Sequence, residues 1–177
     1  MLLQIIQHTP IWVFGLFLAL LWLGLKQTAT RQVKFARLAA MALAMVALSL
    51  YGTLSAFASL PATVLLWALV AAAVAALVRL LPMDPQTEYD PERQLFTLPG
   101  SFQPLLMMMG IFATKYVVGA SLAMHPELAG QADFAYGVGA VYGFFSGLFL
   151  GRTLRLWQLA QRTQASAREW VRSTPMA

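Results

Sequence analysis

One lysine lies inside a long apolar stretch of the sequence and is the first candidate for chemistry. Lys115 is the sole charged residue between Pro104 and Met124. An ammonium group at the centre of a membrane helix costs roughly 2.5–3.5 kcal/mol, so we expect it to face other helices. At a rise of 1.5 Å per residue it lies ~18 Å along the helix from Gln103, near mid-depth of a bilayer. Ionisable groups at that depth usually mark a functional site.

Hydroxyl groups from two other apolar stretches are predicted at the same depth as this lysine. Tyr51 lies ~20 Å and Tyr142 ~18 Å from the same boundary, and a serine follows each one turn later. The predicted substrate-binding set is therefore Lys115, Tyr51, Tyr142, Ser55 and Ser146. The apolar stretches contain no Asp or Glu. Lys115 is then a neutral amine, an ammonium held by hydroxyls and carbonyls, or an ammonium that binds an anion.

The residue types argue against catalysis, cofactors and metals. The chain has no cysteine, which excludes disulfides, thiol catalysis and Cys-ligated metals. The apolar stretches offer no carboxylate dyad and no nucleophile–base pair. Met107, Met108 and Met109 would point ~100° apart on a helix, so they cannot ligate one copper ion together. We therefore expect no enzyme activity, no catalytic residue, no cofactor and no metal.

The elements that position these residues are predicted to be membrane-spanning helices. The 177 residues are 59% hydrophobic and only 11% charged, whereas soluble domains carry about 25% charged residues. A span needs about 20 apolar residues. The sequence predicts an all-α, polytopic bundle of five transmembrane helices, at about residues 9–25, 38–58, 62–80, 103–124 and 134–151.

The basic residues predict the orientation of the bundle. Eleven of the twelve fall between spans 1 and 2, at the end of span 3 or between spans 3 and 4, or after span 5: Lys26, Arg31, Lys34, Arg37, Arg79, Arg93, Arg152, Arg155, Arg162, Arg168 and Arg172. Because cytoplasmic loops are rich in Lys and Arg, the N-terminus is expected outside the cell and the C-terminus in the cytoplasm. These charges fit an anionic inner leaflet, and we expect no nucleic-acid partner.

The chain is expected to form one membrane domain, 1–151, with two cytoplasmic pieces. Residues 82–100 form a loop in which Asp90-Pro91-Glu92-Arg93 is a good turn, and 94–98 favours a strand of a small hairpin. Residues 152–177 form a basic helical tail that leans on the anionic leaflet.

Two matching patterns favour an inverted repeat of helices 1–2 against helices 4–5. Gly15-Leu-Phe with Gly24 matches Gly110-Ile-Phe with Gly119, and Tyr51-Gly with Ser55-Ala matches Tyr142-Gly with Ser146-Gly. Because the two hairpins would enter the membrane from opposite sides, this is the layout of many transporters. Leu20 occupies the position that matches Lys115.

The fifth predicted helix carries a ridge of small residues. Gly139, Gly143, Gly147 and Gly151 recur every four residues, which lets another backbone approach closely. An alanine stripe on the third helix, Ala68, Ala72 and Ala76, is one candidate partner. The ridge packs either within the chain or in a homo-oligomer or against another membrane protein.

The sequence also resembles a known family. The residues that carry the resemblance are Pro99-Gly-Ser-Phe-Gln-Pro-Leu105, Ile111-Phe-Ala-Thr-Lys-Tyr116, Gln7-His-Thr-Pro-Ile-Trp12 and Ser49-Leu-Tyr-Gly52. They are similar to a family of small bacterial multi-spanning inner-membrane proteins known as a domain of unknown function. The resemblance covers nearly the whole chain, places Lys115 in a signature segment, and implies no catalytic residue, cofactor or substrate.

Two functional hypotheses follow. The first is a small transporter or permease-like protein with a mid-membrane polar site around Lys115, for a small anion or polar solute. The alternative is a non-transporting partner or assembly subunit that acts through the glycine-rich helix face and the basic tail.

Overall fold

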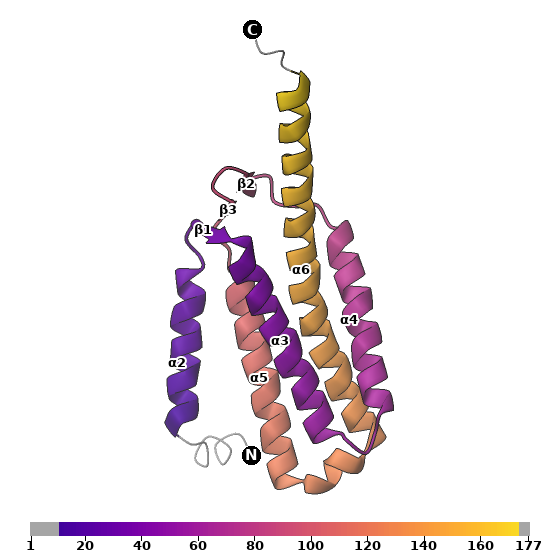
Figure 1. Cartoon of the computed structure of the whole chain (residues 1–177). Coiled ribbons are helices and arrows are strands. Elements are labelled where there is room, and N and C mark those ends of the chain that lie inside the picture. Colours follow the sequence, from indigo (N-terminus) through magenta and orange to yellow (C-terminus); the bar gives the residue numbers. More distant parts are fainter. Residues whose placement is uncertain (1–10, 174–177) are drawn as a thin grey trace.

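The computed structural model describes residues 11–173, with side chains described over 13–166. Within this part the chain is mostly helical, and a small sheet sits at one end of the helices (Figure 1). The elements in chain order are α2 (Ile11–Lys26), β1 (Arg31–Lys34), α3 (Phe35–Ala56), α4 (Ala62–Leu80), β2 (Glu88–Asp90), β3 (Leu95–Leu98), α5 (Gln103–Met124), the 3-10 helix η1 (Pro126–Gly130) and α6 (Ala132–Ser173).

Four of these helices are long and apolar enough to cross a membrane. They are α3, α4, α5 and the described 132–166 part of α6. Helix α2 has 16 residues and would reach only about 24 Å, less than a ~30 Å hydrocarbon core. The predicted start of its span, at residues 9 and 10, lies outside the described residues.

Charge is distributed unequally between the two ends of the bundle. The sheet, the ends of the helices joined to it and the protruding part of α6 share one end (Figure 1). All basic residues of the described part except Lys115 belong to these segments. At the opposite end the chain turns from α3 to α4 and passes through η1 into α6. The charged side chains described there are His125, Glu127 and Asp133.

The sheet contains one strand more than the predicted hairpin. β3, within the expected 94–98, lies at the centre and pairs antiparallel with β2 and with β1, in the order β1-β3-β2. Phe96 and Leu98 are almost fully buried against Leu156 and Ala160 of α6. The sheet is thus fastened to α6 where this helix leaves the bundle.

The glycine ridge packs against α4 of the same chain. A methyl group at Gly143 would lie 2.5 Å from the Trp67 carbonyl oxygen, and one at Gly147 would lie 2.6 Å from the Ala71 carbonyl oxygen. Gly139 and Gly151 meet α4 in the same way, at Thr63 and at Ala75 with Val78. We call this contact, Gly139, Gly143, Gly147 and Gly151 against Thr63, Trp67, Ala71 and Ala75, the α4–α6 seam.

The predicted partner stripe on α4 was wrong by one position. Ala68, Ala72 and Ala76 are exposed, whereas Ala71 and Ala75 are buried in the seam. Adjacent residues point about 100° apart on a helix, so a stripe displaced by one residue faces away from α6. The four-residue spacing of alanines is the same in the exposed set and in the buried set, so the spacing did not show which set faces α6.

The seam predicts opposite effects for two glycine-to-alanine substitutions in α6. Gly143→Ala places a methyl group against the α4 backbone, and overpacking of this kind costs about 1–3 kcal/mol. Gly137→Ala is the matched control, because a Cβ there meets nothing within 4 Å, and alanine favours the helix. We expect a lower melting temperature in detergent for Gly143→Ala and an equal or higher one for Gly137→Ala. Equal losses in both variants would contradict the seam.

Candidate functional site

Lys115 lies near the middle of α5 and reaches between α3 and α6. Its Nζ is 4.7 Å from the centroid of the Tyr142 ring on α6. On the α3 side it faces Gly52, where a Cβ would lie only 3.1 Å from Nζ and 3.5 Å from Cε2 of Tyr142. The missing side chain at Gly52 therefore makes the space that the ammonium and the ring occupy.

A hydrogen-bonded chain of side chains holds Tyr142 beside this lysine. Trp67 Nε1 donates to Ser49 Oγ (3.0 Å), and Ser49 Oγ donates to the Tyr142 carbonyl oxygen (3.2 Å). The Ser146 hydroxyl donates to the same carbonyl at 2.8 Å. The network links α3, α4 and α6 and fixes the position of the Tyr142 backbone.

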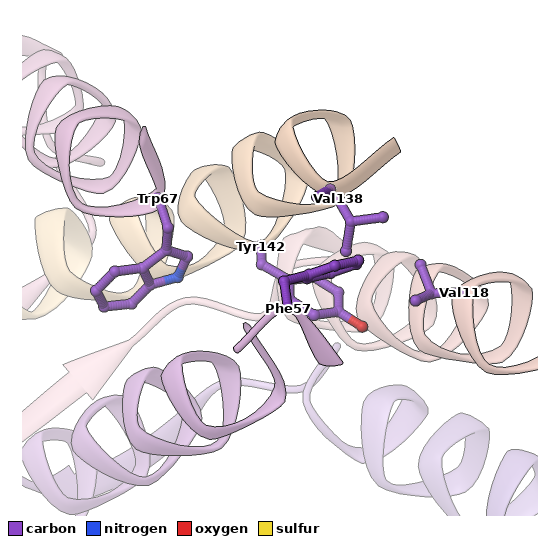
Figure 2. Close-up of a cluster of buried hydrophobic side chains, with 6 residues drawn as sticks. Phe57, Trp67, Val118, Val138 and Tyr142 are labelled. Carbon is purple, nitrogen blue, oxygen red and sulfur yellow. The ribbon is translucent and has the colours of Figure 1, made fainter. Parts of the chain in front are cut away.

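The Tyr142 ring belongs to a buried apolar cluster. Phe57 lies among Trp67, Val118, Val138 and Tyr142, which come from the surrounding helices (Figure 2). Trp67, Val118, Val138 and Tyr142 are each 7–8% exposed, and Phe57 is 1% exposed. The ring face offered to Lys115 is thus held from behind by tightly packed side chains.

A small cavity lies beside the lysine, between α3, α5 and α6. Its volume is about 20 Å³, which is room for about one water molecule. Lys115, Thr114, Ser49, Tyr142 and Ser146 line it together with Met45, Phe145 and Phe149, and its surface is mostly apolar. A species about the size of a water molecule fits here without displacing a helix.

The structure brings together three of the five predicted site residues. Lys115, Tyr142 and Ser146 share the cavity. Tyr51 is 70% exposed, and Ser55 is exposed with its hydroxyl donating to the Gly52 carbonyl oxygen at 3.3 Å. Tyr51 points away from the site because it lies one residue, about 100°, from Gly52 on the helix.

Two site residues on α3, Ser49 and Gly52, were missed by the sequence prediction, which selected residues by their depth in the membrane. Ser49 precedes Gly52 by three residues and the fully buried Thr53 by four, so all three share one face of the helix. This run of small and polar residues was the available signal. It marks the face of α3 that approaches α6.

The comparison with known proteins assigns the chain to a family. A model of the family of unknown function DUF6622 matches residues 1–168. The chain belongs to this family. Its match includes every residue of the cavity, so the Lys115 site lies within the family's own region. No curated protein and no solved structure matches the chain.

The site of this DUF6622 protein contains one lysine and no carboxylate. In the described part of the chain the Asp90–Arg93 ion pair and the His125–Glu127 contact both lie at the ends of the bundle. Lys115 has the face of Tyr142 instead of a carboxylate, and a desolvated contact of this kind is worth about 2 kcal/mol. Among the described residues no group of three or more His, Asp or Glu could hold a metal ion.

The hydroxyl groups around Lys115 have little donor capacity to spare. Ser49 and Ser146 donate to the Tyr142 carbonyl oxygen, and Thr114 donates to the Gly110 carbonyl oxygen at 2.8 Å. Their lone pairs remain available, while the lysine ammonium carries three N–H donors. These free lone pairs can accept hydrogen bonds from N–H donors such as those of Lys115.

Removing the serine that links the helices is predicted to destabilise the site. Ser49→Ala leaves the buried Trp67 N–H without its acceptor, which costs about 1–3 kcal/mol. Ser55→Ala is the matched control, because that hydroxyl is exposed and bonds within its own helix. We expect a lower melting temperature and a changed Trp fluorescence for Ser49→Ala only. Unchanged stability in Ser49→Ala would show that the Trp67–Ser49 bond does not hold the helices.

Proposed function

We propose that this protein is a small membrane transporter in which Lys115 binds a small anion or polar solute at mid-depth. The observation that supports it best is the lysine ammonium, which lines a cavity between three apolar helices without a carboxylate partner in the described part of the chain. Inserting such a charge is costly, and ionisable groups kept inside a membrane usually serve a substrate or proton path.

In this proposal the chain spans a bacterial inner membrane five times, with its N-terminus outside and its C-terminus in the cytoplasm. Four helices have the required length, and the proposal takes the shorter apolar helix α2 as the fifth span. The sheet end is placed in the cytoplasm because it carries the basic residues. The bilayer with its anionic inner leaflet is the expected partner of this end.

The arrangement of the helices is compatible with the proposed inverted repeat. Helix α2 lies beside α5, and α3 packs against α6. A twofold axis in the membrane plane would relate these same pairs. The matching Tyr-Gly-x-x-Ser motifs nevertheless have different surroundings, since Tyr51 is exposed and Tyr142 is buried.

The cavity constrains how such a transporter would work. It holds about one water molecule, so the proposed solute is a small ion, or α3 and α6 separate to admit a larger one. The binding step would replace the Tyr142 ring face by an anion as the partner of the Lys115 ammonium. A role as a partner or assembly subunit would need a surface other than the glycine ridge, because α4 covers it.

Flux measurements test the Lys115 site. We expect wild-type protein in proteoliposomes to release at least one of chloride, nitrate and formate, and Lys115→Met to slow that release roughly tenfold or more, because a charge-assisted hydrogen bond is lost. Lys34→Met removes an exposed cation from β1 and should leave the flux unchanged. The proposal fails if none of the three anions moves, or if Lys115→Met releases it as fast as wild type.

Single-cysteine labelling tests the proposed orientation without background, because the chain has no cysteine. Gly130→Cys places a thiol in the exposed turn beside α6, and Gln86→Cys places one in the exposed loop before β2. In spheroplasts a membrane-impermeant maleimide should label Gly130→Cys at once and Gln86→Cys only after lysis. The reverse pattern would overturn the orientation.

A further inference from the structure

A second cavity lies at the sheet end of the bundle, away from Lys115. Its volume is about 50 Å³. Two arginines, Arg31 of β1 and Arg152 of α6, line it together with the polar side chains of Gln27 and Thr153. Its remaining wall is apolar and includes Leu38, Met41 and Phe149.

The docking of the sheet on α6 brings the two arginines together. Arg31 pairs with Leu98 of β3, and Leu98 packs against Leu156 of α6. Leu156 follows Arg152 by four residues, so the two share one face of the helix. Side chains alternate along a strand, and Val33 packs in the same cluster as Leu98, so Arg31 points to the α6 side of the sheet.

The positive charge of this cavity is not balanced by the described part of the chain. No ion pair or hydrogen bond within this part engages the guanidinium group of Arg31 or of Arg152, whereas Arg93 pairs with Asp90 and Arg155 donates to the Pro82 carbonyl oxygen. Burial lowers the pKa of the Arg152 guanidinium, and the charges of Arg31 and Arg155 lower this pKa further. Burial lowers the pKa of the Arg31 guanidinium, and the charge of Arg37 lowers this pKa further.

We propose that this cavity binds a phosphate group through Arg31 and Arg152. A planar guanidinium presents paired N–H donors that match phosphate oxygens, and two such groups converge here without a carboxylate. Gln27 and Thr153 supply further polar contacts, and the apolar wall suits the glycerol and first methylenes of a lipid. The phosphate comes either from an anionic phospholipid headgroup or from a free anion in solution.

The location agrees with phosphate chemistry at a membrane boundary. The residues that line the cavity come from the beginnings of α3 and α5, from β1 and from α6. Figure 1 shows the beginnings of α3 and α5 next to the sheet, below the protruding part of α6. Clustered basic groups at this level attract anionic headgroups by about 1 kcal/mol each. This site is separate from the proposed transport site and does not depend on Lys115, although Phe149 lines both cavities.

Binding of defined probes to the purified full chain tests this proposal. The probes are phosphatidylglycerol, followed by native mass spectrometry, and inorganic phosphate, followed by calorimetry, with diacylglycerol as a probe that lacks the phosphate. We expect wild type to bind phosphatidylglycerol or phosphate and not diacylglycerol. Arg31→Gln and Arg152→Gln should each weaken binding about tenfold. Binding of phosphatidylglycerol alone identifies the lipid as the source, and comparable binding of inorganic phosphate identifies a free anion.

Matched variants separate loss of the site from loss of the fold. Arg93→Gln removes an exposed arginine and should bind like wild type, and Arg31→Lys keeps the charge and should retain more binding than Arg31→Gln. Lys115→Met should bind the phosphate probes like wild type. A failure of the transport proposal can therefore be distinguished from a failure of the phosphate-site proposal. The proposal is overturned if neither phosphate probe binds, if Arg31→Gln and Arg152→Gln bind like wild type, or if Arg31→Lys loses as much binding as Arg31→Gln.

Discussion

The close approach of α4 and α6 is the constraint on which the rest of this structure depends. Four glycines bring the backbone of α6 against that of α4, and this contact sets both the rotation and the height of α6. The same helix then presents Tyr142 and Ser146 to Lys115, Arg152 to Arg31, and Leu156 to the sheet. Because α6 is one unbroken helix of 42 residues, a single packing contact positions these three features, which lie between Tyr142 and Leu156 along about 21 Å of the helix.

Much of the helical architecture could be predicted, because long uncharged stretches have few alternatives. The bounds of α4 and α5 agree with the predicted 62–80 and 103–124. Strand β1 was not predicted, since Arg31-Gln-Val-Lys34 is short and polar and its partner, β3, lies about sixty residues later in the chain. Neither local composition nor periodicity carries information on such a distant pairing. The pairing depends on where the sheet packs against α6.

For the candidate site, the depth of the residues in the membrane was predicted, but the direction in which their side chains point was predicted only in part. Counting residues from the membrane boundary placed Lys115 and Tyr142 at one level, and they are in contact. The same count placed Tyr51 there, yet its side chain faces outward. Depth along a helix follows from the rise per residue, whereas rotation about the axis follows from the neighbouring helices. On α3 that rotation is set by Ser49, Gly52 and Thr53, the small and polar residues that meet α6.

The α4–α6 seam also has a consequence for the order of biosynthesis. The residues of α4 that receive the glycines, from Thr63 to Ala75, are synthesised well before Gly139 to Gly151. Because the ribosome adds about 5–20 residues per second, α6 is synthesised several seconds after the residues of α4 against which it packs. The contact that organises the described bundle therefore forms only after α6 has been made, and the helices that precede α6 acquire their final arrangement at that point.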